Sequence, residues 1–339
     1  MRKLISISVL LLFVVLQNTL GQQKPQYTQY ILNNYIINPA ITGIENYIDV
    51  KAATRQQWTG LQNAPQTSYF TAHMPIGKSD DWGSSTSYGM VGENPLGRSY
   101  KSEYEASKPH HGIGLVAVID KTGPLSNNTL NVTYAYHIGL APRLNLAVGF
   151  GAGISKVTLN TNDITLENPI DAAIANSGTI NRIKPDLNVG IWLYSAEFFF
   201  GASVQQVLPQ TLSFSSQSSY NTGKTVPHSF FTAGYRFWLS DDVTVIPSVM
   251  VKYVNPVPIG IDFNTKVSFR DKFWIGGAYR KYDSYSGMIG FNLGSLFNVG
   301  YAYDFTQSAL NTVSRGSHEI VLGLTLNNRY RVTCPQKLW

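Results

Sequence analysis

Apolar and polar residues alternate strictly in the stretch from Thr129 to Ser155. Even-numbered positions are apolar from 130 to 140, and the pattern resumes at even positions from 144 to 154. The odd positions between them hold Asn, Thr, Ala, His and Gly. A period of two predicts two β-strands, and the intervening Ala141-Pro142-Arg143 predicts a tight turn that joins them.

The same alternation recurs along the chain and predicts about fourteen strands between residues 47 and 327. Most of them have about 9 to 12 residues, close to the ~9–11 that a tilted membrane-spanning strand needs. An even number of strands is typical of single-chain bacterial barrels. Besides 130–140 and 144–154, the alternating positions that mark the strands lie within 48–55, 69–74, 113–117, 187–193, 198–204, 231–239, 243–253, 259–269, 273–279, 289–293, 297–305 and 320–326.

The two faces of the predicted strands differ in charge. The alternating apolar positions hold no charged residue, and the opposite face is rich in Gly, Asn, Ala and Ser. Charged residues on that opposite face include Asp49, Lys51, Arg55, Lys252, Asp262, Lys266, Arg280, Asp304 and Glu319. A charge that faces lipid at mid-bilayer costs roughly 2–4 kcal/mol, and backbone in lipid must be fully hydrogen-bonded. We therefore predict an all-β protein, a transmembrane antiparallel up-and-down β-barrel with its apolar face toward outer-membrane lipid.

The predicted connections alternate between short and long, as in outer-membrane barrels. The connections 158–186 and 205–228 are long, and 306–317 is intermediate. The short turns lie near Pro142, Ala196, Ser240, Asp271 and Ser295. With both termini expected in the periplasm, the short turns are expected on the periplasmic side. Residues 76–110 form a long polar connection on the short-turn rim, which indicates either a periplasmic insertion or an additional hairpin.

The ends of the chain predict export. Arg2 and Lys3 precede an apolar run, and small residues precede a cleavage point before Gln22; this predicts a signal peptide at residues 1–21. The rest of the chain is expected to form three parts. They are a periplasmic or lumen-plugging segment at 22–46, the barrel at 47–327 and a periplasmic tail at 328–339.

Composition supports a membrane protein. Only 14% of the residues are charged, whereas ~25% is usual in soluble domains. The small positive net charge gives no indication of nucleic-acid binding. Cys334 is the single cysteine, so it cannot form an internal disulfide.

Few residues point to catalysis. Gly77-Lys78-Ser79 lacks the first glycine of a phosphate-binding loop, because Ala72 stands in its place. Gly149-x-Gly151-x-Gly153 lies within a predicted strand on the face opposite the apolar one, where glycine keeps the lumen clear or allows a bend.

The positions of the histidines do not indicate a metal site. Neighbouring residues on a strand point to opposite faces, so we interpret His110 and His111 as the polar end of a loop. His137 and His228 have no sequence neighbours of ligand type. A spatial Ser/His pair stays open, but we expect a protein that is not an enzyme and holds no cofactor or metal.

An ordered series of short motifs spans nearly the whole mature chain. It begins with Tyr27, Tyr30 and Asn33 and ends with Tyr134-Ala135-Tyr136 and Cys334-Pro335. The residues that we single out from the series as candidate site residues are Asn38, Pro39, Ala40, Gly43, Arg55, Gln57, Trp58, Gly60, Pro65, Asp120, Gly123 and Pro124. In this order the series resembles the PorP/SprF family of the Bacteroidetes type IX secretion system.

The resemblance implies a non-enzymatic outer-membrane barrel of the type IX secretion and gliding machinery. It implies as partners a large secreted adhesin, or the adhesin's C-terminal targeting domain, and other type IX secretion components. The barrel is expected to help export the adhesin or to hold it at the cell surface. Residues 76–110 are longer than the family's second turn, and the chain continues past its last strand.

The motif residues also have purely structural interpretations. Asn38-Pro39-Ala40 and Gly43 suit a turn before the first strand, and Asp120 and Gly123-Pro124 are good turn formers. Arg55 lies on the lumen-facing side, where Asp49 or Glu319 is its expected partner. Trp58 suits the interfacial aromatic girdle.

Two alternative functions remain open from the sequence. The first is a diffusion pore or a transporter of apolar ligands, with residues 22–47 folded into the lumen as a plug. The second is a soluble secreted β-sandwich that binds glycans through its many Tyr and Trp side chains.

Overall fold

A computed structural model describes residues 24–77, 104–161, 178–212, 223–240, 242–270, 272–294 and 296–327. The predicted signal peptide, the C-terminal tail with Cys334, and most of the 76–110 connection lie outside these residues. In the part of the chain that is described, no helix has the length and apolar character needed to cross a membrane.

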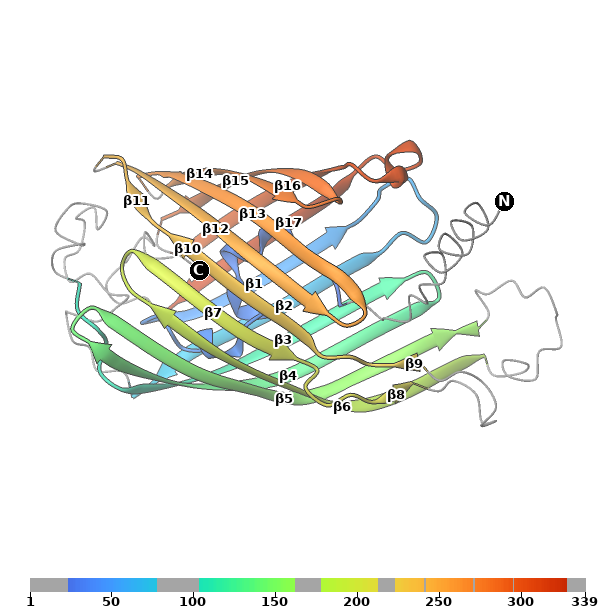
Figure 1. Cartoon of the computed structure of the whole chain (residues 1–339), viewed down its shortest axis with the longest axis horizontal. Helices are drawn as coiled ribbons and strands as arrows, with labels where there is room; N and C mark the ends of the chain where they lie inside the picture. Colours follow the sequence, from blue (N-terminus) through green and yellow to red (C-terminus); the bar gives the residue numbers. More distant parts are fainter. Residues whose placement is uncertain are drawn as a thin grey trace, which may run out of the picture.

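The fold is a closed antiparallel barrel of fourteen strands, as the alternation predicts (Figure 1). Strand β1 pairs with β17, and β10 pairs with β12, so no edge strand remains in the barrel wall. β10 and β11 form one wall strand that is interrupted at Arg236. The wall strands are β1 (Ile48–Gln56), β2 (Gln66–Ile76), β3 (His110–Thr122), β4 (Leu125–Ala141), β5 (Leu144–Asn160), β6 (Thr179–Tyr194), β7 (Phe198–Gln205), β10 (His228–Tyr235), β11 (Phe237–Trp238), β12 (Val243–Val254), β13 (Val257–Phe269), β14 (Phe273–Arg280), β15 (Ser284–Leu293), β16 (Phe297–Thr306) and β17 (Ser317–Leu326).

The uncharged face of the strands points outward, which confirms the assignment of this face to lipid. Val132 is 62% exposed, whereas its neighbours Asn131 and Thr133 are 4% and 3% exposed. Of the nine charged residues on the predicted inner face, seven are buried inside the barrel, and Lys252 and Arg280 line an interior cavity. A soluble sandwich with a charged exterior is therefore excluded.

The barrel has two different rims. The long-loop rim, on the right of Figure 1, carries the β1–β2, β5–β6, β7–β10 and β16–β17 connections, and the short-turn rim carries the β4–β5, β6–β7, β13–β14 and β15–β16 turns. Ile48 starts the wall and Leu326 ends it at the short-turn rim, where the two are paired.

Residues 24–47, here called the interior segment, lie inside the barrel (Figure 1). The segment contains three short 3-10 helices, η1 (Gln29–Leu32), η2 (Asn34–Ile36) and η3 (Pro39–Ile41). Lys24 contacts the long-loop ends of β7 and β10, and the segment reaches β1 at the opposite rim. The described part of the interior segment therefore runs from the long-loop rim to the short-turn rim.

Several predicted boundaries were wrong. β4 and β5 have 17 residues each, and β6 begins at Thr179, so both ends of the predicted 158–186 loop are strand. The 205–228 connection contains a small hairpin of β8 (Thr211–Leu212) and β9 (Gly223–Lys224). η5 (Ala309–Thr312) lies in the 306–317 connection. Strands this long exceed the ~9–11 residues of a membrane crossing. Their ends carry polar residues, so the alternation of apolar and polar positions does not extend over the whole strand.

The membrane orientation can be tested by labelling single cysteines in a Cys334→Ser background. Tyr282 is 80% exposed on the β14–β15 turn of the long-loop rim, and Lys272 is exposed in the β13–β14 turn of the other rim. We expect a membrane-impermeant maleimide to label Tyr282→Cys on intact cells and Lys272→Cys only after the outer membrane is permeabilised. The reverse pattern would contradict the orientation.

Candidate functional site

The interior segment packs against the inner wall through a mainly apolar core. Ile36, Ile37 and Ile41 are at most 5% exposed and belong to one cluster with inward-facing aromatic residues of the wall, such as Trp192 and Trp274. Full burial of one isoleucine side chain contributes about 1.5–3 kcal/mol. The segment is therefore an integral part of the folded core rather than a loose chain inside a channel.

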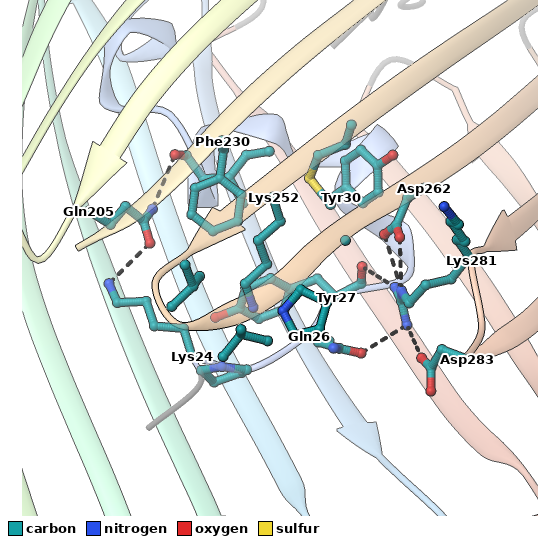
Figure 2. Close-up of a pocket in the computed structure, with 18 residues that line it drawn as sticks. Lys24, Gln26, Tyr27, Tyr30, Gln205, Phe230, Lys252, Asp262, Lys281 and Asp283 are labelled. Carbon is teal, nitrogen blue, oxygen red and sulfur yellow. Dashed lines mark hydrogen bonds and ion pairs between the residues drawn. The ribbon is translucent and has the colours of Figure 1, made fainter. Parts of the chain in front are cut away.

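Lys24, the first described residue of the interior segment, is held by polar groups of β7 and β10, and Figure 2 shows its contact with Gln205 of β7. Lys24 Nζ donates to Gln205 Oε1 at 3.0 Å, and Lys24 N donates to His228 Nε2 at 3.2 Å. Gln205 Nε2 donates in turn to Ile36 O at 2.9 Å. One glutamine thus connects two separate parts of the segment to the end of β7.

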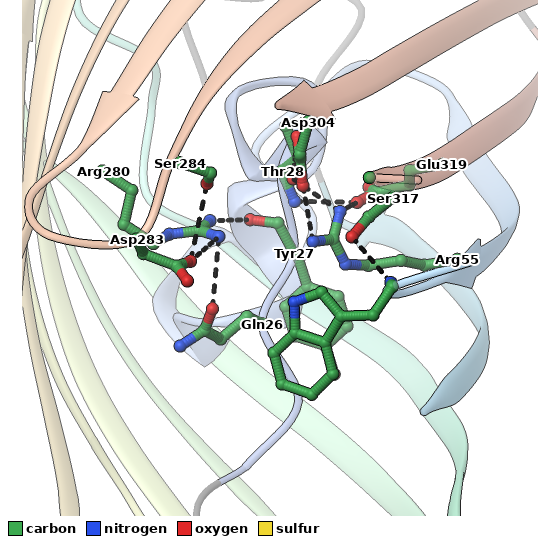
Figure 3. Close-up of polar contacts among 12 residues, drawn as sticks. Gln26, Tyr27, Thr28, Arg55, Arg280, Asp283, Ser284, Asp304, Ser317 and Glu319 are labelled. Carbon is green, nitrogen blue, oxygen red and sulfur yellow. Dashed lines mark hydrogen bonds and ion pairs between the residues drawn. The ribbon is translucent and has the colours of Figure 1, made fainter. Parts of the chain in front are cut away.

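Arg55 forms the centre of a buried charge cluster at the long-loop rim (Figure 3). Its Nη2 lies 2.6 Å from Asp304 Oδ2, and its Nη1 lies 3.1 Å from Glu319 Oε2. Thr28 N donates to Glu319 Oε2 at 2.7 Å, and Gln29 N donates to Glu319 Oε1 at 3.1 Å. Of the two expected partners, Glu319 pairs with Arg55, whereas Asp49 pairs with Lys51.

Arg280 forms a second cluster beside the first one (Figure 3). Its Nε lies 3.1 Å from Asp262 Oδ2, and its Nη1 lies 3.2 Å from Asp283 Oδ2. Arg280 also donates to Gln26 Oε1 at 3.2 Å and to Tyr27 O at 3.4 Å. Residues 26–29 are therefore held by guanidinium groups and carboxylates from four wall strands, β1, β14, β16 and β17.

Three buried histidines hold the other end of the interior segment, near the short-turn rim. His73 Nδ1 accepts from Gly43 N at 3.1 Å, and His110 Nε2 lies 3.3 Å from Gly43 O. His137 Nε2 donates to Thr42 O at 2.8 Å, and the rings of His110 and His137 stack with centroids 4.5 Å apart. The wall thus satisfies backbone groups that the bend at residues 42–43 leaves without helical partners.

Glycine fits this bend at position 43 because of its backbone conformation and because the wall leaves no room for a side chain. Its φ is +75°, a left-handed conformation that favours glycine. A Cβ atom on Gly43 would lie 2.4 Å from Gly112 Cα in β3. Two glycine backbones are therefore in direct contact where the segment touches the wall.

The Asn38-Pro39-Ala40 motif lies against β5 and β6. Asn38 Oδ1 accepts from Ala40 N at 3.0 Å and caps η3, and Asn38 Nδ2 donates to Ile191 O at 2.9 Å. A Cβ on Gly149 would lie 2.5 Å from Ala40 Cα. Glycine at this position therefore leaves room for the interior segment, in keeping with its predicted role of clearing the lumen.

The remaining candidate residues gather at the long-loop rim. Gln57 N donates to Pro65 O at 2.9 Å within the β1–β2 connection, whose Gly60 has a φ of +97°. Trp58 is half-buried there, and its N donates to Ser317 Oγ at 3.1 Å.

The β3–β4 turn is tied to the same connection. Gly123 N donates to Asn63 O at 3.1 Å, and Asp120 Oδ1 accepts from Thr67 Oγ1 at 2.6 Å. Pro124 O accepts from Asn160 N at 2.9 Å. The twelve candidates thus form two groups at opposite ends of the interior segment.

Two predictions about side chains need correction. Asp304 is a direct partner of Arg55 and was not singled out as one, although it was placed on the inner face. His110 and His111 lie within β3 and do not form a loop end. Their opposite directions are as predicted: His110 is buried inside, and His111 is exposed and hydrogen-bonds Tyr134 OH. Within the described residues, no three His, Cys, Asp or Glu side chains gather as a metal site would require.

These features define a class: an outer-membrane β-barrel whose interior is occupied by its own N-terminal segment. Residues 19–324 match the family model described as "Type IX secretion system membrane protein PorP/SprF", and the chain belongs to this family. A comparison with curated proteins gave no match.

Solved structures of outer-membrane barrels are similar in architecture at low sequence identity. The toluene transporter TbuX of Ralstonia pickettii is 11% identical, with a TM-score of 0.48, over 86% of this chain and 92% of that chain. A FadL homologue of Pseudomonas aeruginosa is 9% identical, with a TM-score of 0.46, over 90% and 95%. The translocator domain of the autotransporter NalP from Neisseria meningitidis is 10% identical, with a TM-score of 0.43, over 83% and 88%.

Replacement of Arg55 tests the charge cluster. Arg55→Gln leaves the carboxylates of Asp304 and Glu319 buried without a cation, so we expect the free energy of unfolding to fall by about 3–5 kcal/mol. Urea unfolding of the refolded barrel, followed by tryptophan fluorescence, measures this change.

Arg270→Gln is the matched control. Arg270 forms an exposed ion pair with Asp242 at 3.1 Å, with side chains 59% and 39% exposed. Its loss is expected to lower the free energy of unfolding far less than the loss of Arg55, because exposed ion pairs contribute little. Equal effects of the two substitutions would show that the Arg55 cluster does not stabilise the barrel.

Proposed function

We propose that this protein is a non-enzymatic docking barrel of the type IX secretion and gliding machinery. It helps export a large adhesin, or retains it at the cell surface, by binding the adhesin's C-terminal targeting domain. The observation that carries the proposal is the family match over residues 19–324. Membership of a secretion-system family also supports contacts with other components of that system.

The barrel has the physical properties of an anchor. Every wall strand is paired on both sides, so the barrel cannot leave the bilayer without exposing backbone groups to hydrocarbon. A partner that binds the loops is therefore retained in the membrane together with the barrel. The interior segment, fixed at both ends, supports this role more than a diffusion pore.

The long-loop rim offers an organised surface for such a partner. The β1–β2 and β16–β17 connections are joined by hydrogen bonds, with Thr59 N donating to Gly316 O and Arg315 N to Thr59 O, each at 2.8 Å. A preorganised surface loses less conformational entropy on binding. Two large apolar side chains project from this rim: Tyr282 is 80% exposed and Val313 is 56% exposed.

Affinity purification from detergent-solubilised outer membrane tests the docking role. We expect the wild-type barrel to recover a large protein that bears a type IX targeting domain. The double variant Tyr282→Ala/Val313→Ser is expected to recover at least about tenfold less, because aromatic anchors such as tyrosine often dominate binding energy.

The matched control for this purification is Arg270→Ala/Lys272→Ala on the short-turn rim, which is expected to recover wild-type amounts. Failure of the wild-type barrel to recover any such partner would contradict the proposal. Equal losses in the two double variants would contradict a docking surface on the long-loop rim.

Planar-bilayer conductance separates the anchor from the pore. The wild-type barrel is expected to give no steady current, because the interior segment packs inside the lumen. Deletion of residues 24–41 is expected to produce an open current, and a general porin serves as the positive control. A steady wild-type current equal to that of the deletion variant would favour the pore.

A further inference from the structure

A cavity of about 160 Å³ lies at the long-loop rim, between the interior segment and the strands β7, β10, β12, β13 and β14 (Figure 2). Met250, Lys252 and Val254 line it from alternate positions of β12, and Phe230 lines it from β10. A dry apolar cavity of about 150 Å³ in another protein holds benzene. The volume therefore suits a compact apolar group of about six carbon atoms.

The charges around this cavity do not balance. Among the described residues, Lys24, Lys252, Arg280 and Lys281 line it together with two carboxylates, Asp262 and Asp283, which leaves an excess of two positive charges. Both carboxylates are already paired with Arg280.

Among the described residues, Lys252 has no ion-pair partner. It is half-buried, and no carboxylate of the described residues lies within salt-bridge distance of its Nζ or that of Lys24. Lys24 Nζ is engaged by the neutral amide of Gln205. A partly buried ammonium without an anion is costly, and a bound anion removes that cost.

We propose that this cavity binds a small amphipathic carboxylate, with its head group on Lys252 and a compact apolar group against Phe230, Met250 and Val254. The head group forms a charge-assisted hydrogen bond with the ammonium. Two sources supply this chemistry: a free short-chain carboxylic acid, or the carboxyl terminus of a polypeptide that ends in an apolar residue. The site goes beyond the proposed docking role and does not depend on it.

Isothermal titration calorimetry of the full-length barrel in detergent tests the site, with detergent micelles alone as the blank. Hexanoate represents the free acid, and N-acetyl-Gly-Leu represents a polypeptide terminus; hexanamide and N-acetyl-Gly-Leu-amide are their neutral counterparts. We expect at least one carboxylate to bind at least about tenfold more tightly than its amide. Which carboxylate binds identifies the source.

The apolar part of the site is tested by chain length. Butyrate has two methylenes fewer than hexanoate, and each buried methylene contributes about 0.8 kcal/mol. If hexanoate binds, butyrate is expected to bind about tenfold more weakly. Equal binding of butyrate and hexanoate would overturn the apolar half of the site.

Lys252→Met tests the head-group contact, with Lys272→Met on the opposite rim as the control. We expect Lys252→Met to abolish the difference between carboxylate and amide, and Lys272→Met to preserve it. Heat-modifiable migration on gels verifies that each variant is folded. The proposal is overturned if neither carboxylate binds the wild-type protein, if the amides bind equally well, or if Lys252→Met binds like the wild type. The comparison of carboxylates with amides needs no variant.

Discussion

A side chain on a membrane-spanning strand has only two directions, toward lipid or toward the interior of the barrel. Because a charge in hydrocarbon costs roughly 2–4 kcal/mol at mid-bilayer, the charged positions of this chain are directed inward. Asp49, Lys51, Arg55 and Glu319 are accordingly at most 4% exposed inside the barrel. An interior charge that lacks a partner is also costly, so the lipid outside determines that an ordered polar network must form inside.

The interior segment is the second consequence of the same constraint. Its short 3-10 helices leave backbone groups unpaired at membrane depth, and such groups are tolerated only when the protein itself satisfies them. The wall does so on every side. Glu319 accepts from the amides of residues 28 and 29, Ser203 and Gln205 donate to Ile37 O, and His137 donates to Thr42 O. Polar groups of the wall and of the interior segment therefore hydrogen-bond each other, and each part would leave buried polar groups unpaired without the other.

The features that depend on local periodicity could be predicted from the sequence. The number of strands, the lipid-facing side and the short turns all follow from alternation and turn residues, and the structure confirms them. The Arg55–Glu319 pair was within reach because both residues lie on the inner face. It forms because β1 and β17 close the barrel in a register that places Arg55 opposite Glu319.

The rest depends on register and on contacts between distant parts of the chain. His110 lies opposite His137 across β3 and β4, and His73 comes from β2, so the cluster appears only once the sheet is aligned. The path of the interior segment from one rim to the other has no periodic signal at all. Its direction is set by Lys24 and by Gly43, which contact opposite ends of the wall.

The two groups of family-motif residues gain a common physical explanation from this arrangement. Asn38 and Gly43 fix the end of the interior segment near the short-turn rim, and Arg55 fixes its end at the long-loop rim. The β1–β2 connection that follows Arg55 is bonded to both the β3–β4 turn and the β16–β17 connection. One continuous set of contacts therefore runs from the long-loop rim through Arg55 and Thr28 to the bend at Gly43. In the proposed docking role, a partner at the long-loop rim would rest on this segment, whose buried contacts with the wall would resist pulling together with the loops.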